Sequence, residues 1–197
     1  MIKSGVFHAS FHRGFAPALR TLPGRRTGRT SAYEIETAVG PLALAFHVNP
    51  KASAIPYCAG ECWPLLHAPA PLRRAEGDDG LVSWYQYTTE PEHAAIQALQ
   101  RRVYAKVAAQ DGFAVDVHRQ MRDNSLPLLR ATTEAPLEAR FPHTALAYLD
   151  ADDAEAWGTL LGAQLPGWLA RFQAQPETLE SYMWRVHWTA EVGRRHG

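Results

Sequence analysis

Residues 31–48 (SAYEIETAVGPLALAFHV) constrain the fold most, because they contain two alternating segments joined by a turn. Apolar and polar or small residues alternate in 31–38 and again in 42–48, so each segment can bury one face as a β-strand. Between them, Gly40 tolerates positive φ and Pro41 fixes its own φ, which is typical of a turn. A two-stranded ribbon is marginally stable in water, so other segments must cover its apolar face.

The remaining segments predict further strands and several amphipathic helices. Residues 81–89 (LVSWYQYTT) and 143–149 (HTALAYL) alternate as strands do. Apolar spacings of three or four residues, with proline and capping signals, predict helices near 5–20, 91–110, 113–123, 152–163, 166–174 and 177–188. We therefore predict a single α+β domain over residues 1–197. Its sheet is mainly antiparallel, with about four strands near 31–38, 42–48, 81–89 and 143–149, and the helices cover it.

Charge and composition narrow the expected partners and location. Lys and Arg total 20, as do Asp and Glu, so no net charge draws the chain to nucleic acid or anionic lipid. No apolar run approaches the roughly 20 residues that a membrane span requires. The first residues lack the long apolar region of a signal peptide. Two cysteines without an export signal favour a reducing compartment, so we expect a cytoplasmic protein of bacterial type.

Residues 49–71 (NPKASAIPYCAGECWPLLHAPAP) are predicted to form a packed, irregular loop. Its five prolines argue against a long helix or a central strand, and long packed loops often bind partners. Within it lie Cys58, Cys62 and His67, and His47 precedes it; two thiolates and two imidazoles could hold zinc. The Cys-x3-Cys spacing is looser than usual zinc pairs. A short disulfide loop, a reactive or redox pair, a cysteine nucleophile with a histidine base, and free buried thiols therefore remain alternatives.

Two polar groups near the N-terminus also have competing interpretations. His8 and His12 are four residues apart beside a phenylalanine stripe, so they could chelate a metal from one helical face or be half-exposed neighbours of that stripe. Arg25, Arg26 and Arg29 occur in the segment LPGRRTGRT and could clamp a phosphate or an acidic partner. The other interpretation of this segment is a solvated, positively charged turn.

Sequence motifs of the common enzyme families do not occur in the chain. It contains no Gly-rich nucleotide-binding or P-loop motif, no H-E-x-x-H and no G-x-S-x-G. This does not exclude an enzyme, because catalytic groups converge in space and not in sequence.

The order of an N-terminal helix, a basic turn (GRRTGRT), an alternating sheet and a C-terminal helix with LPGWLARF resembles an uncharacterised bacterial family of small α+β proteins. Some members of that family are associated with toxin–immunity neighbourhoods, and the resemblance implies no catalytic residues. Our first hypothesis is a non-catalytic protein-binding protein of immunity or accessory type, without a cofactor. Its predicted contact residues are Trp63, Tyr57, Tyr85, Tyr87, Arg25, Arg26 and Arg29.

The alternative hypothesis is a metal-binding protein or enzyme centred on Cys58, Cys62, His67 and His47, with zinc as its cofactor. An offset aromatic patch on the last helix could mark a homodimer contact. A structural component of a phage or mobile element, which would form large homo-oligomers, is a third hypothesis.

Overall fold

The computed structural model describes residues 2–49, 60–72, 80–82, 84–109 and 146–176, and it has the predicted α+β architecture. The helices are α1 (Ser4–Leu19), α2 (Glu90–Ala108) and α4 (Ala151–Ala174), with short 3-10 turns η1 (Ala70–Leu72) and η2 (Tyr85–Tyr87). The strands are β1 (Gly24–Arg26), β2 (Ala32–Thr37), β3 (Gly40–Asn49), β4 (Gly60–His67), β5 (Leu81–Val82) and β6 (Leu146–Tyr148). The predicted helices near 113–123 and 177–188 lie outside the described residues.

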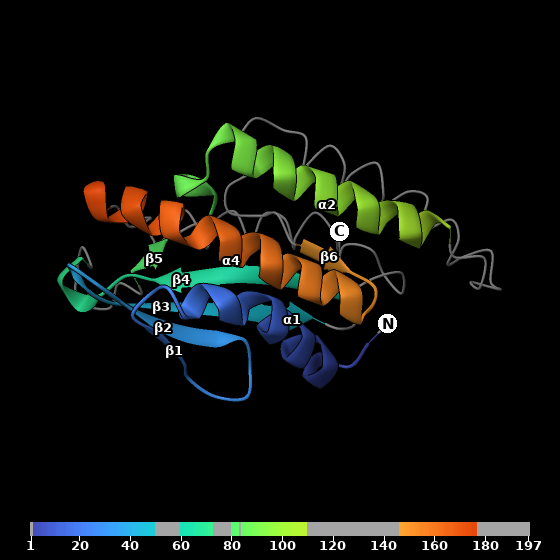
Figure 1. The fold of residues 1–197 in the computed structure, drawn as a ribbon, viewed down its shortest axis with the longest axis horizontal. Coiled ribbons are helices and arrows are strands. Elements are labelled where there is room, and N and C mark those ends of the chain that lie inside the picture. The colour runs from blue at the N-terminus through green and yellow to red at the C-terminus, as the bar shows by residue number, and fades with distance from the viewer. Residues whose placement is uncertain (1, 50–59, 73–79, 83, 110–145, 177–197) are drawn as a thin grey trace, which may run out of the picture.

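The strands form one antiparallel sheet in the order β1-β2-β3-β4-β5, and β6 also pairs with β4 (Figure 1). The predicted hairpin is confirmed, because Ala32–Thr37 pairs with Gly40–Ala45 around the expected turn. Gly40 has a φ of 115° in that turn, a conformation that glycine adopts without strain. The fourth predicted strand is also found, as β6.

The prediction that its prolines exclude residues 49–71 from a central strand is wrong, because β4 pairs with three other strands. Phe46 donates its N–H over 2.8 Å to the carbonyl of Ser31, the residue before β2, so its backbone groups point away from β4. Phe46 and Pro64 are opposite each other and are therefore a non-hydrogen-bonded pair, which leaves the Pro64 nitrogen facing the other side of β4. There β6 pairs with residues 60–62 and β5 with residues 66–67, so neither requires an N–H from Pro64.

Two further predictions about elements need correction. Of the described residues in the predicted strand 81–89, only Leu81–Val82 form a strand, and Tyr85–Tyr87 form η2. Here Trp84 is buried, its ring stacks on Trp168 with the centroids 5.4 Å apart, and its carbonyl accepts a 2.7 Å hydrogen bond from the Trp168 indole. The basic segment predicted as a turn contains the edge strand β1.

Pro166 does not divide the C-terminal helix as predicted, because α4 runs unbroken through it. The proline removes one helical hydrogen bond, the one that its N–H would donate to the carbonyl of Gly162. Buried side chains on both sides of it pack into the same core and hold the helix together: Trp157, Leu161, Leu165, Trp168, Leu169 and Phe172. The packing of these side chains outweighs the tendency of proline to break the helix.

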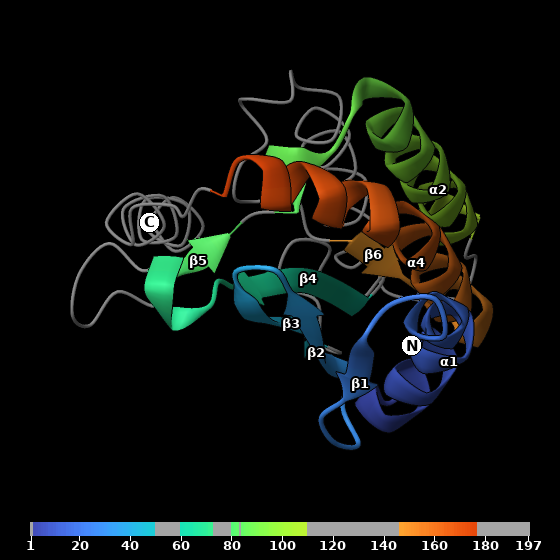
Figure 2. The ribbon, with the colours of Figure 1, turned by 60° about the vertical axis from the view of Figure 1, so that its left-hand side comes forward.

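α1 and α4 lie side by side on one face of the sheet, and α2 packs on α4 and β6 (Figure 2). The backbones of α1 and α4 approach closely at two glycines. A Cβ on Gly158 would lie 2.1 Å from the Phe11 carbonyl oxygen, and one on Gly14 would lie 2.2 Å from that of Glu155. The close approach lets the buried phenylalanines of α1 reach the sheet: Phe7, Phe11 and Phe15. The ring centroids of Phe11 and Phe46 are 4.2 Å apart.

The free edge of β6 is satisfied by side chains from two helices. Ala147 donates its N–H to Gln100 Oε1 of α2 over 3.1 Å, and its carbonyl accepts from the Trp157 indole of α4 over 2.8 Å. Both hydrogen bonds are buried, so they replace a further strand at this edge. None of the described helices combines the length and apolar character needed to cross a membrane.

Candidate functional site

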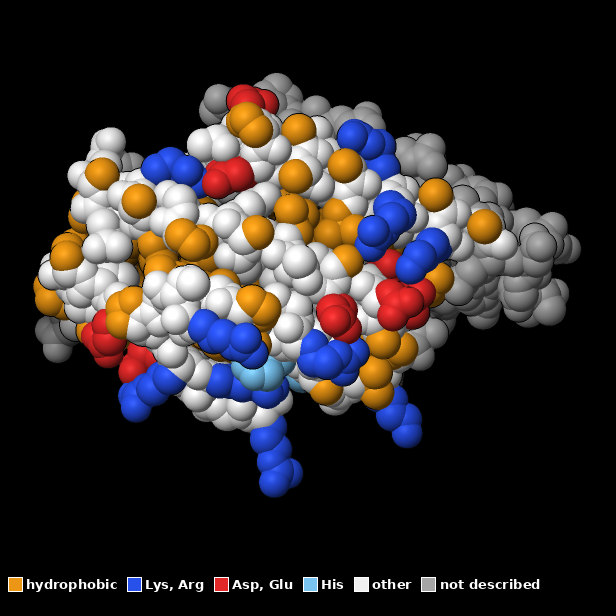
Figure 3. Space-filling view, viewed as in Figure 1, with side chains coloured by type: hydrophobic (Ala, Val, Ile, Leu, Met, Phe, Trp, Pro, Cys, Tyr) orange, Lys and Arg blue, Asp and Glu red, His pale blue; other side chains and the backbone are white. Residues whose placement is uncertain are grey.

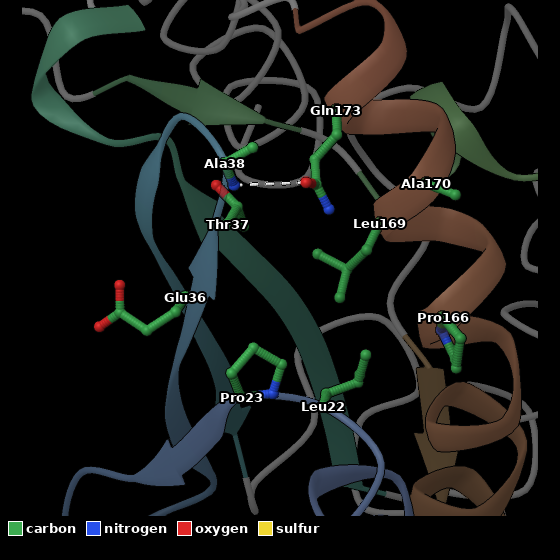
Figure 4. Close-up of a pocket in the computed structure, with 9 residues that line it drawn as sticks. All are labelled: Leu22, Pro23, Glu36, Thr37, Ala38, Pro166, Leu169, Ala170 and Gln173. Atoms are coloured by element: carbon green, nitrogen blue, oxygen red, sulfur yellow. Dashed lines mark hydrogen bonds between the residues drawn. The ribbon is translucent and has the colours of Figure 1, made fainter.

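A groove of about 460 Å³ lies between the tip of the β2–β3 hairpin and the C-terminal half of α4 (Figure 4). Its lining is mainly apolar, and it is open to solvent. In Figure 3, apolar side chains gather in a hollow between this part of α4 and the strands below it. The lining residues are Leu22, Pro23, Glu36, Thr37, Ala38, Pro166, Leu169, Ala170 and Gln173. We call this the hairpin groove.

The α4 wall of the hairpin groove is set by the helix that Pro166 does not break. Leu169 is 3% exposed and anchors the wall in the core, whereas Pro166 and Ala170 are exposed along the groove. The Leu169 side chain points between the two walls, and the Glu36 carboxylate points away from the groove (Figure 4). The described lining therefore offers apolar contact area with no ionised group directed into it.

The opposite wall is the end of β2 and the turn after it, where a side chain of α4 accepts a backbone hydrogen bond. Ala38 donates its N–H to Gln173 Oε1 of α4 over 3.3 Å. The Thr37 hydroxyl donates to the Gly40 carbonyl over 2.6 Å and accepts from the Val39 N–H, which fixes the turn. The Gln173 amide oxygen thus already occupies the position from which a peptide carbonyl could accept the Ala38 N–H.

A second polar arrangement joins α1 to the start of β2. His8 Nδ1 lies 3.0 Å from both the backbone nitrogen and the hydroxyl of Ser31, and His12 Nδ1 lies 3.3 Å from the Tyr33 hydroxyl. Burial, followed by the charge of Arg26, lowers the pKa of both histidines below the ordinary 6.5. Burial raises the pKa of Tyr33 to about 12, so its phenol stays protonated.

The structure separates the predicted zinc ligands that it describes. Cys62 is in the core, where burial raises the pKa of its thiol well above the ordinary value. In the pairing of β3 with β4, His47 is opposite Trp63 and His67 is opposite Ala43. Both histidines therefore lie on the sheet face opposite to that of Cys62, and the thiol cannot reach them across the sheet. Within the described part of the chain, no three His, Cys, Asp or Glu side chains are grouped to hold a metal. Cys58 lies outside the described residues, and zinc binding stays a prediction.

The predicted contact residues are distributed over several surfaces. Tyr85 is buried, and Tyr87 packs edge-on against Trp168 while its hydroxyl donates to the Gln175 carbonyl over 2.9 Å. Trp63 is half-buried on the sheet face away from α1, with its ring 5.8 Å from that of His47. Tyr57 lies outside the described residues. The described aromatic residues therefore do not form one contiguous patch.

The three predicted arginines also differ in their surroundings. Arg25 donates to Glu34 Oε1 through Nε and Nη2, at 3.0 and 2.6 Å. Arg26 donates to the carbonyls of Thr30 and Arg29, at 3.0 and 2.7 Å, and Arg29 itself is exposed. The segment is a short strand followed by a turn, and the two Arg26 hydrogen bonds hold that turn closed.

Comparison with models of known families, with curated proteins and with solved structures finds no match to this chain. The resemblance to a bacterial α+β family therefore stays a prediction. The hairpin groove was not predicted from the sequence, because its walls come from residues 22–38 and 166–173. The one local signal was Pro166, whose ring lines the groove at a point where a helix break was expected.

Proposed function

We propose that this chain is a non-catalytic binding protein of accessory or immunity type, and that the hairpin groove receives an extended segment of a partner protein. The observation that carries the proposal is the pairing of an apolar wall, Leu169 to Ala170, with a backbone N–H at Ala38, in the turn that follows β2. An extended peptide needs both features, a pocket for a side chain and a partner for its backbone. A cytoplasmic location and a bacterial origin, expected from composition, belong to the same proposal.

The chemistry of the groove favours a peptide over a charged or strongly polar ligand. Its volume of about 460 Å³ suits one or two large apolar side chains, and the open side leaves room for the chain that carries them. The Ala38 N–H already bonds to a side-chain amide oxygen, which a peptide carbonyl can replace at little cost because the two acceptors are equivalent. The partner therefore contributes an apolar residue within an extended segment.

The test is selection of peptides from a displayed random library on the purified protein, followed by binding measurements with two variants. Ala170→Arg introduces a long charged side chain into the groove from an exposed position. Ala98→Arg makes the same change at an exposed position of α2, away from the groove, and serves as the matched control. We expect selected peptides to carry an apolar residue, to bind the Ala98→Arg control normally, and to lose about tenfold or more in affinity for Ala170→Arg.

Peptides that bind both variants equally would contradict the proposal, and so would a selection that yields no binder above background. A small apolar dye gives a further comparison. If Ala170→Arg abolishes binding of the dye while no peptide depends on the groove, the occupant is a small molecule and the proposed protein-binding function is wrong.

A further inference from the structure

The second polar arrangement is built by the register of β1 against β2 and by one face of α1. We call it the histidine–arginine cluster: His8, His12, Arg26, Ser31 and Tyr33. Arg26 is opposite Tyr33 in the ladder, so both side chains lie on the sheet face that α1 covers, whereas Arg25 pairs with Glu34 on the other face. His8 and His12 are one helical turn apart and meet Ser31 and Tyr33 there.

The hydrogen bond from the Ser31 N–H determines which nitrogen of His8 carries a proton, and the contact with Tyr33 is compatible with the same tautomer of His12. Because the Ser31 N–H donates to His8 Nδ1, that nitrogen holds a lone pair, and the neutral ring carries its proton on Nε2. The protonated Tyr33 phenol lies 3.3 Å from His12 Nδ1, and when it donates to that nitrogen the second ring has the same tautomer. Both rings then present an Nε2–H donor, and neither presents a lone pair to a metal ion.

The positive charge of the cluster is not balanced by a carboxylate among the described residues. Arg26 is held in place by its bonds to two backbone carbonyls of its own turn, which carry no charge. Of the acidic side chains nearby in the fold, Glu34 bonds to Arg25 and Glu155 bonds to Arg13. At the lower edge of Figure 3, a histidine side chain lies among several basic ones. A fixed guanidinium and two imidazole donors are therefore left without an acidic counterpart in the described part of the chain.

We propose that the histidine–arginine cluster binds a phosphoryl group, with Arg26 supplying the charge and the Nε2–H groups of His8 and His12 donating to its oxygens. Guanidinium and N–H donors in a fixed arrangement suit a tetrahedral oxyanion, and charge-assisted hydrogen bonds of this kind are the strong ones. The site goes beyond the proposed protein binding. None of the five residues of the cluster lines the hairpin groove.

The experiment follows the histidine side-chain resonances by NMR during titration with inorganic phosphate at constant ionic strength and at pH 7.5. His8→Asn and His12→Asn assign the two rings. Each also tests the site, because the asparagine Oδ1 can replace Nδ1 as acceptor while the Nε2–H donor is deleted. Arg26→Gln removes the charge. Arg25→Gln is the matched control, since it removes the same charge from the neighbouring residue on the opposite face.

We expect saturable shifts of His8 and His12 in the wild-type chain and in Arg25→Gln, and affinity about tenfold weaker or more in Arg26→Gln. His12→Asn should also weaken binding, which keeps the test valid if Arg26→Gln fails to fold. Sodium acetate, titrated in parallel, should bind more weakly than phosphate. Absence of saturable shifts, equal losses in Arg25→Gln and Arg26→Gln, or tighter binding of acetate would overturn the proposal. The peptide measurements with Ala170→Arg are unaffected by any of these results.

Discussion

Gly158→Ala tests whether contact between the backbones of α1 and α4 sets the packing of the domain. The added Cβ would lie 2.1 Å from the Phe11 carbonyl oxygen and 3.0 Å from the Phe15 nitrogen. These are backbone atoms of a helix, so no rotamer change can relieve the contact, and the helices would have to separate by about 1 Å or more. Such overpacking costs about 1–3 kcal/mol, here at the upper end. Alanine regains about 1 kcal/mol through helix propensity.

We therefore expect Gly158→Ala to reduce the free energy of unfolding by about 2 kcal/mol and to lower the Tm by about 4–8 °C. Urea denaturation followed by circular dichroism measures the former, and a thermal scan the latter.

Two glycines of the same helices provide matched controls. A Cβ on Gly162, one turn along α4, would meet its nearest atom at 3.4 Å, and one on Gly5 of α1 would meet nothing within 4 Å. Gly162→Ala and Gly5→Ala should thus leave stability unchanged or raise it by up to about 1 kcal/mol. If Gly158→Ala proves as stable as the wild type while these controls behave as expected, the close approach of α1 and α4 is not what the structure indicates.

Two further predictions concern the polar contacts that join α2 to the rest of the domain. Gln100→Leu removes the acceptor of the buried Ala147 N–H, so we expect a loss of about 1–3 kcal/mol in urea denaturation; an unchanged midpoint would show that β6 does not depend on this bond. Partial burial alone would raise the pKa of Asp150, but the Asp153 amide and the Lys106 ammonium outweigh it and hold that pKa below the ordinary 3.8. The carboxylate therefore stabilises the fold fully above about pH 3.8, and this stability is lost as the pH falls through the lower folded value. Lys106→Met should flatten the dependence of the urea midpoint on pH below about pH 4, and an unaltered slope would contradict the role given to Lys106.

The predictable part of the fold is the part whose physics is local. In the hairpin, alternation and turn chemistry occur within residues 31–48, so neighbouring residues alone specify the pairing of β2 with β3. Pro64 is the opposite case. Whether a strand tolerates a proline depends on which side of the strand loses a donor, and that is set by pairing with β3, β5 and β6. No pattern within residues 49–71 contains this information.

The errors at 81–89 and at Pro166 have a common cause. Alternating aromatic residues predicted a long strand, but Trp84 and Trp168 gain more from stacking and from the hydrogen bond between them than Trp84 would gain in the ladder. Trp168 follows Pro166 by two residues, and its burial helps to keep α4 continuous through the proline. Contacts between segments 84 residues apart decide both elements, and local propensity is a weak guide where they do.

The histidine–arginine cluster is even harder to predict from local sequence. Which arginine belongs to it depends on the register of a three-residue strand. The spacing of His8 and His12 predicts that they share a helical face but not what they face. A shift of β1 by one residue would place Arg25 beside Tyr33 and Arg26 on the opposite face, and two consecutive arginines make these registers chemically alike. Gly24 favours the observed register, since a Cβ there would lie 3.2 Å from Leu19 Cδ2, and a one-residue shift would bring a side chain to this position and require Leu19 to move. A residue that favours the placement of Arg26 in the cluster therefore takes no part in binding.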